Sequence, residues 1–383
     1  MRRRCALAYI LLAMAPLLLN CSESAPARPN LILITTEGLP TQNLACYGRK
    51  TQRGYGICAL GETGARFVWA FSPTLETTPA AATLLTGQSP DLNQVDASVA
   101  SFLRSSQVTL PELLKEGGYS TAAFIANPKL NRARNLNQGF DLYADRVEAA
   151  SMARTARQWV RQNSEPWFVW FHLSRLDPSV HQEFPIERPA TPIASDEAGL
   201  QRLDQLTSEI VALLSDEGRP PGILFAGLHS QTPRARKKKP GNLDPLRVPL
   251  FWRAPESSSG PGVSRRITRP VSLMDVAPTL IEAAGLATES RDALAGQPFP
   301  YTNSEETSLR ALRLEDPDAV WIIRGAEYAR FPKSQSGSAS PESGRLWPKN
   351  TAQRESTPAA STRDYDADRI QRLSPGIQTR GLP

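Results

Sequence analysis

Three runs of apolar residues limit the folds that are open to this chain of 383 residues. They cover residues 30–35, 167–172 and 222–226, and none of them alternates polar with apolar side chains. Continuous apolar runs of strand length are typical of parallel strands that are buried on both faces. The chain is therefore expected to form a mostly parallel sheet between two layers of helices.

Helical segments alternate with these strands along the chain. Further strands are expected near residues 67, 120 and 248. Helices are expected over residues 110–117, 147–162, 197–217 and 274–284. Alternation of strands and helices indicates the α/β class. We expect one large α/β domain over residues 28–299.

Two of the expected elements carry polar groups at one edge of the sheet. The first strand ends at Glu37, and ligands gather at the carboxyl ends of strands in open α/β sheets. Residues 77–87 begin with two threonines and Pro79 and end at Gly87, which predicts a helix with a cap, a proline at a first helical position and a glycine stop. The amino end of such a helix can hold an anion.

These motifs resemble the sulfatase family of the alkaline phosphatase superfamily. The family opens with a strand that ends in paired aspartates, and Glu37-Gly38 stands at that place. Spacers of the family follow in their usual order at residues 44–48, 64–67 and 70–73. Further landmarks at residues 118–124, 138–141 and 275–280 extend the resemblance to roughly residue 330. The resemblance implies a sulfatase-like, alkaline-phosphatase-like fold.

The resemblance also aligns the residue that carries the reaction. In the family a cysteine or serine that becomes formylglycine stands two residues before a proline, and serine and arginine follow. Thr77, Pro79, Ala80 and Ala81 occupy these positions. Threonine cannot yield the aldehyde, although some phosphodiesterases of the superfamily use an unmodified threonine as nucleophile. Ala81 removes the cation that would hold the sulfate.

Other family positions are substituted too. Ser179 stands where the family places a histidine near the sulfate, and His181 comes two residues later. Leu228 and His229 replace the aspartate and the asparagine or histidine that complete the metal site. The family's active-site lysine aligns with Lys238 when it is counted back without gaps from residues 246–249.

The metal that the family uses is calcium, which takes about 6 to 8 oxygen ligands, several of them anionic. Glu37 is the one carboxylate left at the four expected positions, and Leu228 supplies no lone pair. His229 offers a nitrogen, which suits zinc or copper better than calcium. Glu37 and His229 are therefore read as remnants of a weak metal site. We expect no tightly bound metal and no cofactor.

Each candidate residue also has a purely structural interpretation. Thr77 or Thr78 can be the cap of the following helix. Glu37 can be a solvated loop carboxylate, and His172, at the end of an aromatic strand, a satisfied core histidine. Lys238 belongs to the basic run at residues 234–239, which is typical of a solvated loop.

Residues 1–20 resemble a secretory signal. Arg2, Arg3 and Arg4 precede an apolar stretch over residues 5–19, which is too short for a confident membrane span. Residues 18–21, Leu-Leu-Asn-Cys, resemble a bacterial lipobox, in which Cys21 receives lipid and anchors the exported protein to the membrane of the cell envelope. Asn20 departs from the small residue that is usual there, and an ordinary signal peptide is the alternative.

Charge and cysteine content narrow the class of partner. Removing residues 1–20, with three arginines and no acid, lowers the formal net charge from +6 to +3, which gives no support for a nucleic-acid partner. The basic run at residues 234–239 could contact an anionic polysaccharide.

Cys46 and Cys58 remain after processing; an oxidising compartment permits a disulfide between them, and buried thiols are the alternative.

Two functions remain open at this point. Residues 300–332 are expected to form a reduced carboxyl-terminal subdomain. Residues 333–383, rich in Ser, Gly, Pro and charge, are expected to be largely disordered. The favoured function is a degenerate sulfatase-fold lipoprotein of the cell envelope that has lost hydrolysis and serves as an anion- or glycan-binding module, for an anionic polysaccharide or a sulfated or phosphorylated ligand, or as an interaction module. The alternative is a hydrolase of sulfuric or phosphoric esters that uses Thr77 as nucleophile, with Lys238 and His229 as charge stabilisers.

Overall fold

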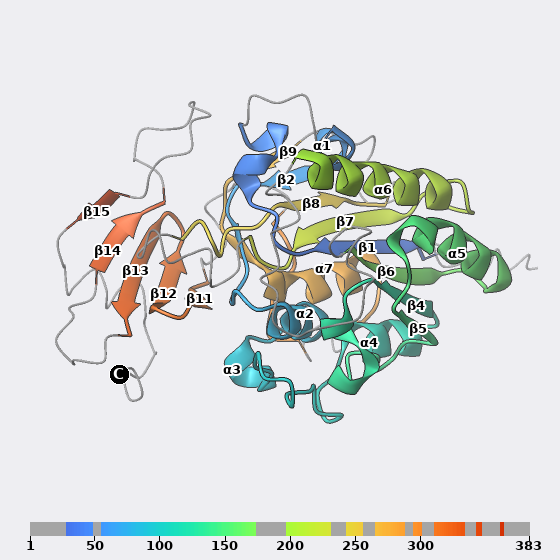
Figure 1. The fold of residues 1–383 in the computed structure, drawn as a ribbon, viewed down its shortest axis with the longest axis horizontal. Helices are drawn as coiled ribbons and strands as arrows, with labels where there is room; N and C mark the ends of the chain where they lie inside the picture. Colours follow the sequence, from blue (N-terminus) through green and yellow to red (C-terminus); the bar gives the residue numbers. More distant parts are fainter. Residues whose placement is uncertain are drawn as a thin grey trace, which may run out of the picture.

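The computed structural model describes residues 28–48, 55–173, 197–230, 243–255, 265–287, 294–300, 310–333, 342–346 and 361–363. Eight of the described strands form one large sheet (Figure 1). In spatial order they are β5 (Leu142–Asp145), β4 (Ser120–Ile125), β6 (Trp167–Leu173), β1 (Leu31–Thr36), β7 (Gly222–Gly227), β8 (Leu250–Arg253), β2 (Ala65–Phe67) and β9 (Arg265–Ile267).

The sheet is mostly parallel, as the sequence predicts. All neighbours from β5 to β7 pair in parallel, and β8 alone runs antiparallel to both of its neighbours. Successive side chains of β1 enter opposite layers of the core: Leu31 and Leu33 pack on one face, Ile32 and Ile34 on the other. Burial on both faces explains why the strand shows no polar alternation.

Helices cover both faces of this sheet. On one face lie α1 (Tyr55–Glu62), α5 (Ala149–Gln162) and α6 (Glu197–Ser215). On the other lie α2 (Thr77–Thr86), α4 (Leu110–Glu116) and α7 (Val276–Ala283), with the short α3 (Pro90–Asn93) after α2 (Figure 1). None of the described helices combines the length and the apolar character that crossing a bilayer requires.

A second, antiparallel sheet forms the carboxyl-terminal part. Its strands are β11 (Leu312–Glu315), β12 (Ala319–Arg324), β13 (Glu327–Pro332), β14 (Glu342–Arg345) and β15 (Ser361–Arg363). Trp321 and Leu314 belong to the same buried apolar cluster as Phe71 of the short strand β3 (Ala70–Phe71), which pairs with β10 (Val271–Ser272). A shared apolar cluster therefore joins this sheet to the large domain.

Two short strands lie within residues 333–383, where the sequence predicts a largely disordered tail. β14 pairs in register with β13, and β15 pairs with β14, so the second sheet extends past the boundary expected at residue 332. Backbone pairing to an existing strand supplies the order that the composition of these residues does not indicate. The signal peptide expected at residues 1–20 and the lipidation site Cys21 lie outside the described residues.

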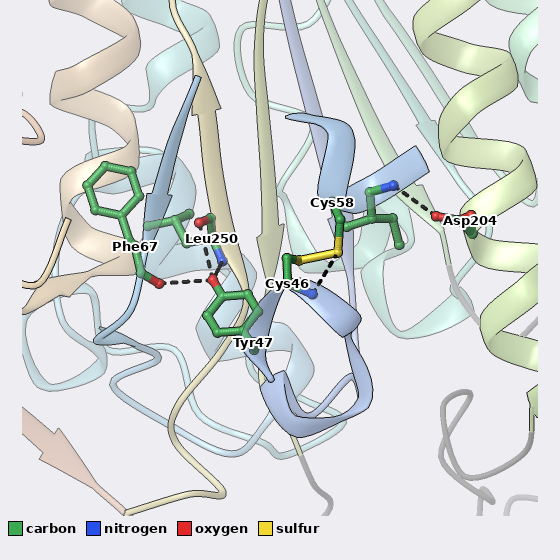
Figure 2. The surroundings of a disulfide bond; sticks show 7 residues. Cys46, Tyr47, Cys58, Phe67, Asp204 and Leu250 are labelled. Carbon is green, nitrogen blue, oxygen red and sulfur yellow. Dashed lines mark hydrogen bonds between the residues drawn. A yellow bond between two sulfur atoms is a disulfide. The ribbon is translucent and has the colours of Figure 1, made fainter. Parts of the chain in front are cut away.

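Cys46 and Cys58 form a disulfide, which settles the choice that the sequence leaves open. The bond joins the short 3-10 turn Ala45–Tyr47 to α1 (Figure 2). The backbone N–H of Ile57, beside this bond, donates to Asp204 on α6 at 2.8 Å. Together these contacts hold the segment after β1 against the helices of one face.

Candidate functional site

The site lies where β1 and β7 end side by side. Two backbone hydrogen bonds tie the segments that follow these strands: Leu228 N–H donates to Thr36 O at 2.7 Å, and Gly38 N–H to His229 O at 2.9 Å. Glu37 and His229 are thereby brought together, with 3.7 Å between Glu37 Oε2 and His229 Nε2. The sequence predicts both residues at this edge, and the structure places them there.

Thr77, at the start of α2, joins them. Its hydroxyl donates a hydrogen bond to Glu37 Oε2 and lies 3.3 Å from His229 Nε2. The helix cap predicted at Thr77 or Thr78 is wrong: Glu76 is the cap residue, and Thr77 is the first helical residue. Pro79 accordingly lies at the third helical position, not the first. The Thr77 hydroxyl is directed to a carboxylate and not to the N–H groups of its own helix.

Asn127 is a member of the site that the sequence reasoning missed. It follows β4, and its Nδ2 donates to Glu37 Oε1 at 2.7 Å. Its Oδ1 accepts from Lys129 N–H at 2.9 Å, which fixes the orientation of the amide. The position was open to prediction, because residue 127 closely follows the carboxyl end of an expected strand. We call Glu37, Thr77, Asn127 and His229 the Glu37 cluster.

The carboxylate of Glu37 is strongly favoured over its acid form. Burial by itself raises the pKa of Glu37, but the imidazole of His229, the more distant His172 and the Thr77 hydroxyl together hold that pKa well below its usual range. The Glu37 side chain is 16% exposed and Thr77 is 2% exposed. Glu37 is therefore a largely buried anion held by donors of the protein, and not the solvated loop carboxylate that the sequence also allows.

His172 is a core histidine, as the structural interpretation predicts, but it is satisfied at one nitrogen only. Its Nδ1 lies 2.9 Å from Thr35 Oγ1, which also accepts from Trp170 Nε1 at 2.9 Å. Within the described part of the chain, His172 Nε2 and His229 Nδ1 are buried without a hydrogen-bond partner. Burial lowers the pKa of His172 to about 4; Glu37 raises this pKa and His229 lowers it, so the two neighbours oppose each other. The His172 ring is therefore neutral at pH 7.

The donors of the Glu37 cluster do not fit the family's calcium. Glu37 supplies one carboxylate, already bonded to Thr77 and Asn127, and Leu228 is fully buried and apolar. Among the described residues no group of three or more His, Cys, Asp and Glu side chains could hold a metal ion. The vestigial metal role expected for Glu37 and His229 therefore has no complete ligand set in the described residues.

Ala80 and Ala81 are fully buried in the apolar core beneath α2. A charged side chain at either position would therefore have apolar neighbours. Lys238, Ser179 and His181 lie outside the described residues. The charge-stabilising role expected for Lys238 stays a prediction.

Comparison with known proteins agrees with this architecture. The family model described as Sulfatase matches residues 29–286. The chain is 30% identical over 103 residues to an N-acetylglucosamine-6-O-sulfatase of Bacteroides thetaiotaomicron, covering 27% of this chain and 18% of that enzyme. The aligned stretch thus spans less than a fifth of the length of this relative.

Solved structures show the same fold at low identity. Ps i-CgsB in complex with k-i-k-neocarrahexaose is 16% identical with a TM-score of 0.61, covering 82% of this chain and 86% of that one. A protein in the alkaline phosphatase superfamily from Vibrio parahaemolyticus is 14% identical with a TM-score of 0.62, covering 91% of this chain and 85% of that one.

Proposed function

The chain belongs to the sulfatase family, and we propose that it binds a sulfated or phosphorylated glycan without hydrolysing it. One observation carries this proposal: the hydroxyl at the nucleophile position donates to a carboxylate that Asn127 also holds. Efficient general bases have a pKa near the working pH. Glu37, whose pKa lies far below its usual range, is a poor acceptor for the proton of Thr77.

The charge of the Glu37 cluster also opposes hydrolysis of an anionic ester. Developing negative charge at the reacting centre is usually stabilised by cations or by oriented donors. Here the described donors of Thr77 and Asn127 point at Glu37, and Ala81 and Leu228 contribute no charge. A sulfate group entering the cluster would meet a carboxylate in place of a cation.

Two relatives support the ligand class. One is named an N-acetylglucosamine-6-O-sulfatase, and one fold neighbour was solved with a neocarrahexaose bound. Both names point to a carbohydrate ligand, and the former to one that carries sulfate. The function proposed for this chain keeps that ligand and omits the cleavage step.

The same proposal includes a location in the bacterial cell envelope. Residues 1–20 are interpreted as a signal peptide and Cys21 as the lipidated amino terminus. A membrane anchor would hold the binding domain close to envelope or extracellular polysaccharide. Metabolic labelling with a fatty acid tests this part, because the label should be absent from a Cys21→Ser variant.

Incubation of the purified protein with an aryl sulfate and an aryl phosphodiester, with and without calcium or zinc, tests the loss of hydrolysis. We expect no turnover of either substrate above that of a Thr77→Ala variant. Titration with a sulfated oligosaccharide should give saturable binding, and the desulfated oligosaccharide should bind at least about tenfold more weakly, because each charge-assisted hydrogen bond contributes about 1.5–3 kcal/mol.

One contact favours the second candidate, an active ester hydrolase. Thr77 Oγ1 lies 3.3 Å from His229 Nε2, which resembles a nucleophile beside its base. Turnover that is lost in Thr77→Ala but retained in a Thr74→Ala control would support this function and contradict the binding-only proposal.

A further inference from the structure

Arg247 is a buried cation that lies outside the Glu37 cluster. It is 6% exposed, and its Nε–H donates to Val68 O at 3.0 Å. No described residue accepts a hydrogen bond from its two terminal amino groups. These groups are not among the fully buried polar atoms without a partner, so the guanidinium keeps N–H donors that no described residue accepts.

Aromatic rings fix the position of this guanidinium. Arg247 Cζ lies 4.4 Å from the ring centre of Trp69 and 5.9 Å from that of Tyr47, within the range of cation–π attraction. Tyr47 is itself held, because its hydroxyl donates to Phe67 O at 2.9 Å and accepts from Leu250 N–H at 3.1 Å (Figure 2). Burial raises the pKa of Tyr47 to about 12, so the phenol stays neutral.

Two further arginines gather at the same tyrosine. Arg66 Cζ on β2 lies 5.6 Å from the Tyr47 ring centre, and Arg266 on β9 is its register partner in the adjacent strand. Arg266 is exposed and Arg66 is partly buried.

The three guanidinium groups act on one another electrostatically. Burial lowers the pKa of Arg247, and Arg266 and Arg66 lower it further, against the opposite effects of Tyr47 and Asp244. An arginine remains protonated despite such a shift. Like charges that packing holds together are relieved by an anion, and the planar guanidinium fork pairs with two oxygens of a tetrahedral oxyanion.

We propose that Arg66, Arg247 and Arg266 form a binding site for a sulfate ester of an anionic glycan. The site shares no residue with the Glu37 cluster, and β7 and β8 lie between β1 and the strands that carry Arg66 and Arg266. This proposal rests on the proposed binding function and identifies where on the protein the sulfated glycan would bind. It also resolves a conflict of charge. The carboxylate of the Glu37 cluster would repel a sulfate group, whereas the guanidinium groups of the arginine site would attract it.

Isothermal titration calorimetry of the purified full chain with a sulfated carrageenan hexasaccharide and its desulfated counterpart tests the site. Arg266→Ser removes an exposed cation, and Arg66→Ser/Arg266→Ser removes two. Arg247→Lys keeps the charge but removes the planar fork. The matched control is Arg154→Ser on α5, an exposed arginine whose ion pair to Glu209 spans 4.0 Å. Thermal melting of each variant reports whether it is folded.

We expect the double variant to bind the sulfated hexasaccharide about tenfold or more weakly, since charge-assisted hydrogen bonds are lost. Arg266→Ser and Arg247→Lys should each weaken binding, and Arg154→Ser should change it less than about twofold, in the range of an exposed charge. Unchanged binding by the double variant, or equal losses in Arg154→Ser, would overturn the site and leave the proposed function intact. Absence of binding by the unsubstituted protein would overturn both.

Discussion

Thr77 donates its hydroxyl hydrogen bond to Glu37, which precedes it by 40 residues in the chain. The residue at the family's nucleophile position is thereby tied to the carboxylate at the family's metal position. Asn127 occupies the second oxygen of the same carboxylate at 2.7 Å. Both oxygens of Glu37 are thus bonded to side chains of the protein.

Replacement of this hydroxyl should therefore destabilise the protein. Thr77→Val keeps the shape of the side chain but removes a donor from a largely buried carboxylate. Loss of one partner of a buried polar group costs about 1–3 kcal/mol, more when the group is charged. Urea unfolding at pH 7 measures the loss as a lower midpoint.

Thr83 on the same helix provides the control for this substitution. It is fully buried, and within the described residues its Oγ1 has no hydrogen-bond partner. Thr83→Val should be neutral or stabilising, because a buried hydroxyl without a partner is itself unfavourable. Equal destabilisation by Thr77→Val and Thr83→Val would mean that the hydrogen bond to Glu37 contributes nothing.

A second carboxylate beside Glu37 should make stability strongly dependent on pH. Asn127→Asp keeps the oxygen that accepts from Lys129 N–H but replaces the donor to Glu37 with a negative charge. Two adjacent carboxylates raise the pKa of the pair in the folded state. The variant should lose about 2 kcal/mol or more at pH 7 and regain part of it below pH 5, where the pair binds a proton.

Asn131→Asp is the matched control for that charge. Asn131 likewise accepts a backbone hydrogen bond, from Ala133 N–H at 2.9 Å, and its amide donates to Pro128 O. No carboxylate is its described partner in either bond. Its variant should show a much smaller change between pH 5 and pH 7; an equal pH dependence in both variants would contradict the pairing of Asn127 with Glu37.

The large sheet could be predicted because its inner strands carry an unambiguous signal. β1, β6 and β7 are buried on both faces, so their sequences contain almost no polar residue. The helix α1 was not predicted, since Gly56 and Gly61 weaken the helical pattern. Both glycines are explained by packing: a Cβ at Gly61 would lie 2.9 Å from Phe251 Cδ1, and one at Gly56 would collide with Ser208.

The sequence predicts where the site lies, but not which of its side chains are hydrogen-bonded to each other. Glu37 and His229 follow from the rule that polar groups gather at the carboxyl ends of parallel strands. The bond between Thr77 and Glu37 could not be predicted, because a threonine before a helix is ordinarily its cap and 40 residues separate the two. The order of β14 and β15 depends likewise on pairing with strands that the local sequence does not reveal.

His172 should make the protein less stable in mild acid. Its pKa is about 4 in the folded protein and 6.5 in the reference state, so the unfolded chain binds the proton first as the pH falls. Its contribution is fully present above pH 6.5 and is lost progressively down to pH 4, by up to about 3 kcal/mol. His172→Asn, which can keep a polar atom near Thr35, should show a shallower decline in urea midpoint over this range. An unchanged slope would exclude His172 as its source.

The disulfide between Cys46 and Cys58 should stabilise the fold and the aromatic side of the arginine site. The bond closes a loop with a sequence separation of 12, for which the loss of chain entropy in the unfolded state predicts about 3 kcal/mol. Cys46→Ser/Cys58→Ser should unfold at a lower denaturant concentration than the oxidised protein, and reductant should lower the midpoint of the unsubstituted protein but not of the variant.

Tyr47 adjoins Cys46, so the variant should also bind the sulfated hexasaccharide more weakly even where it remains folded. A variant with an unchanged midpoint would show that the packing of α1 against α6, including the bond from Ile57 to Asp204, is sufficient without the covalent link.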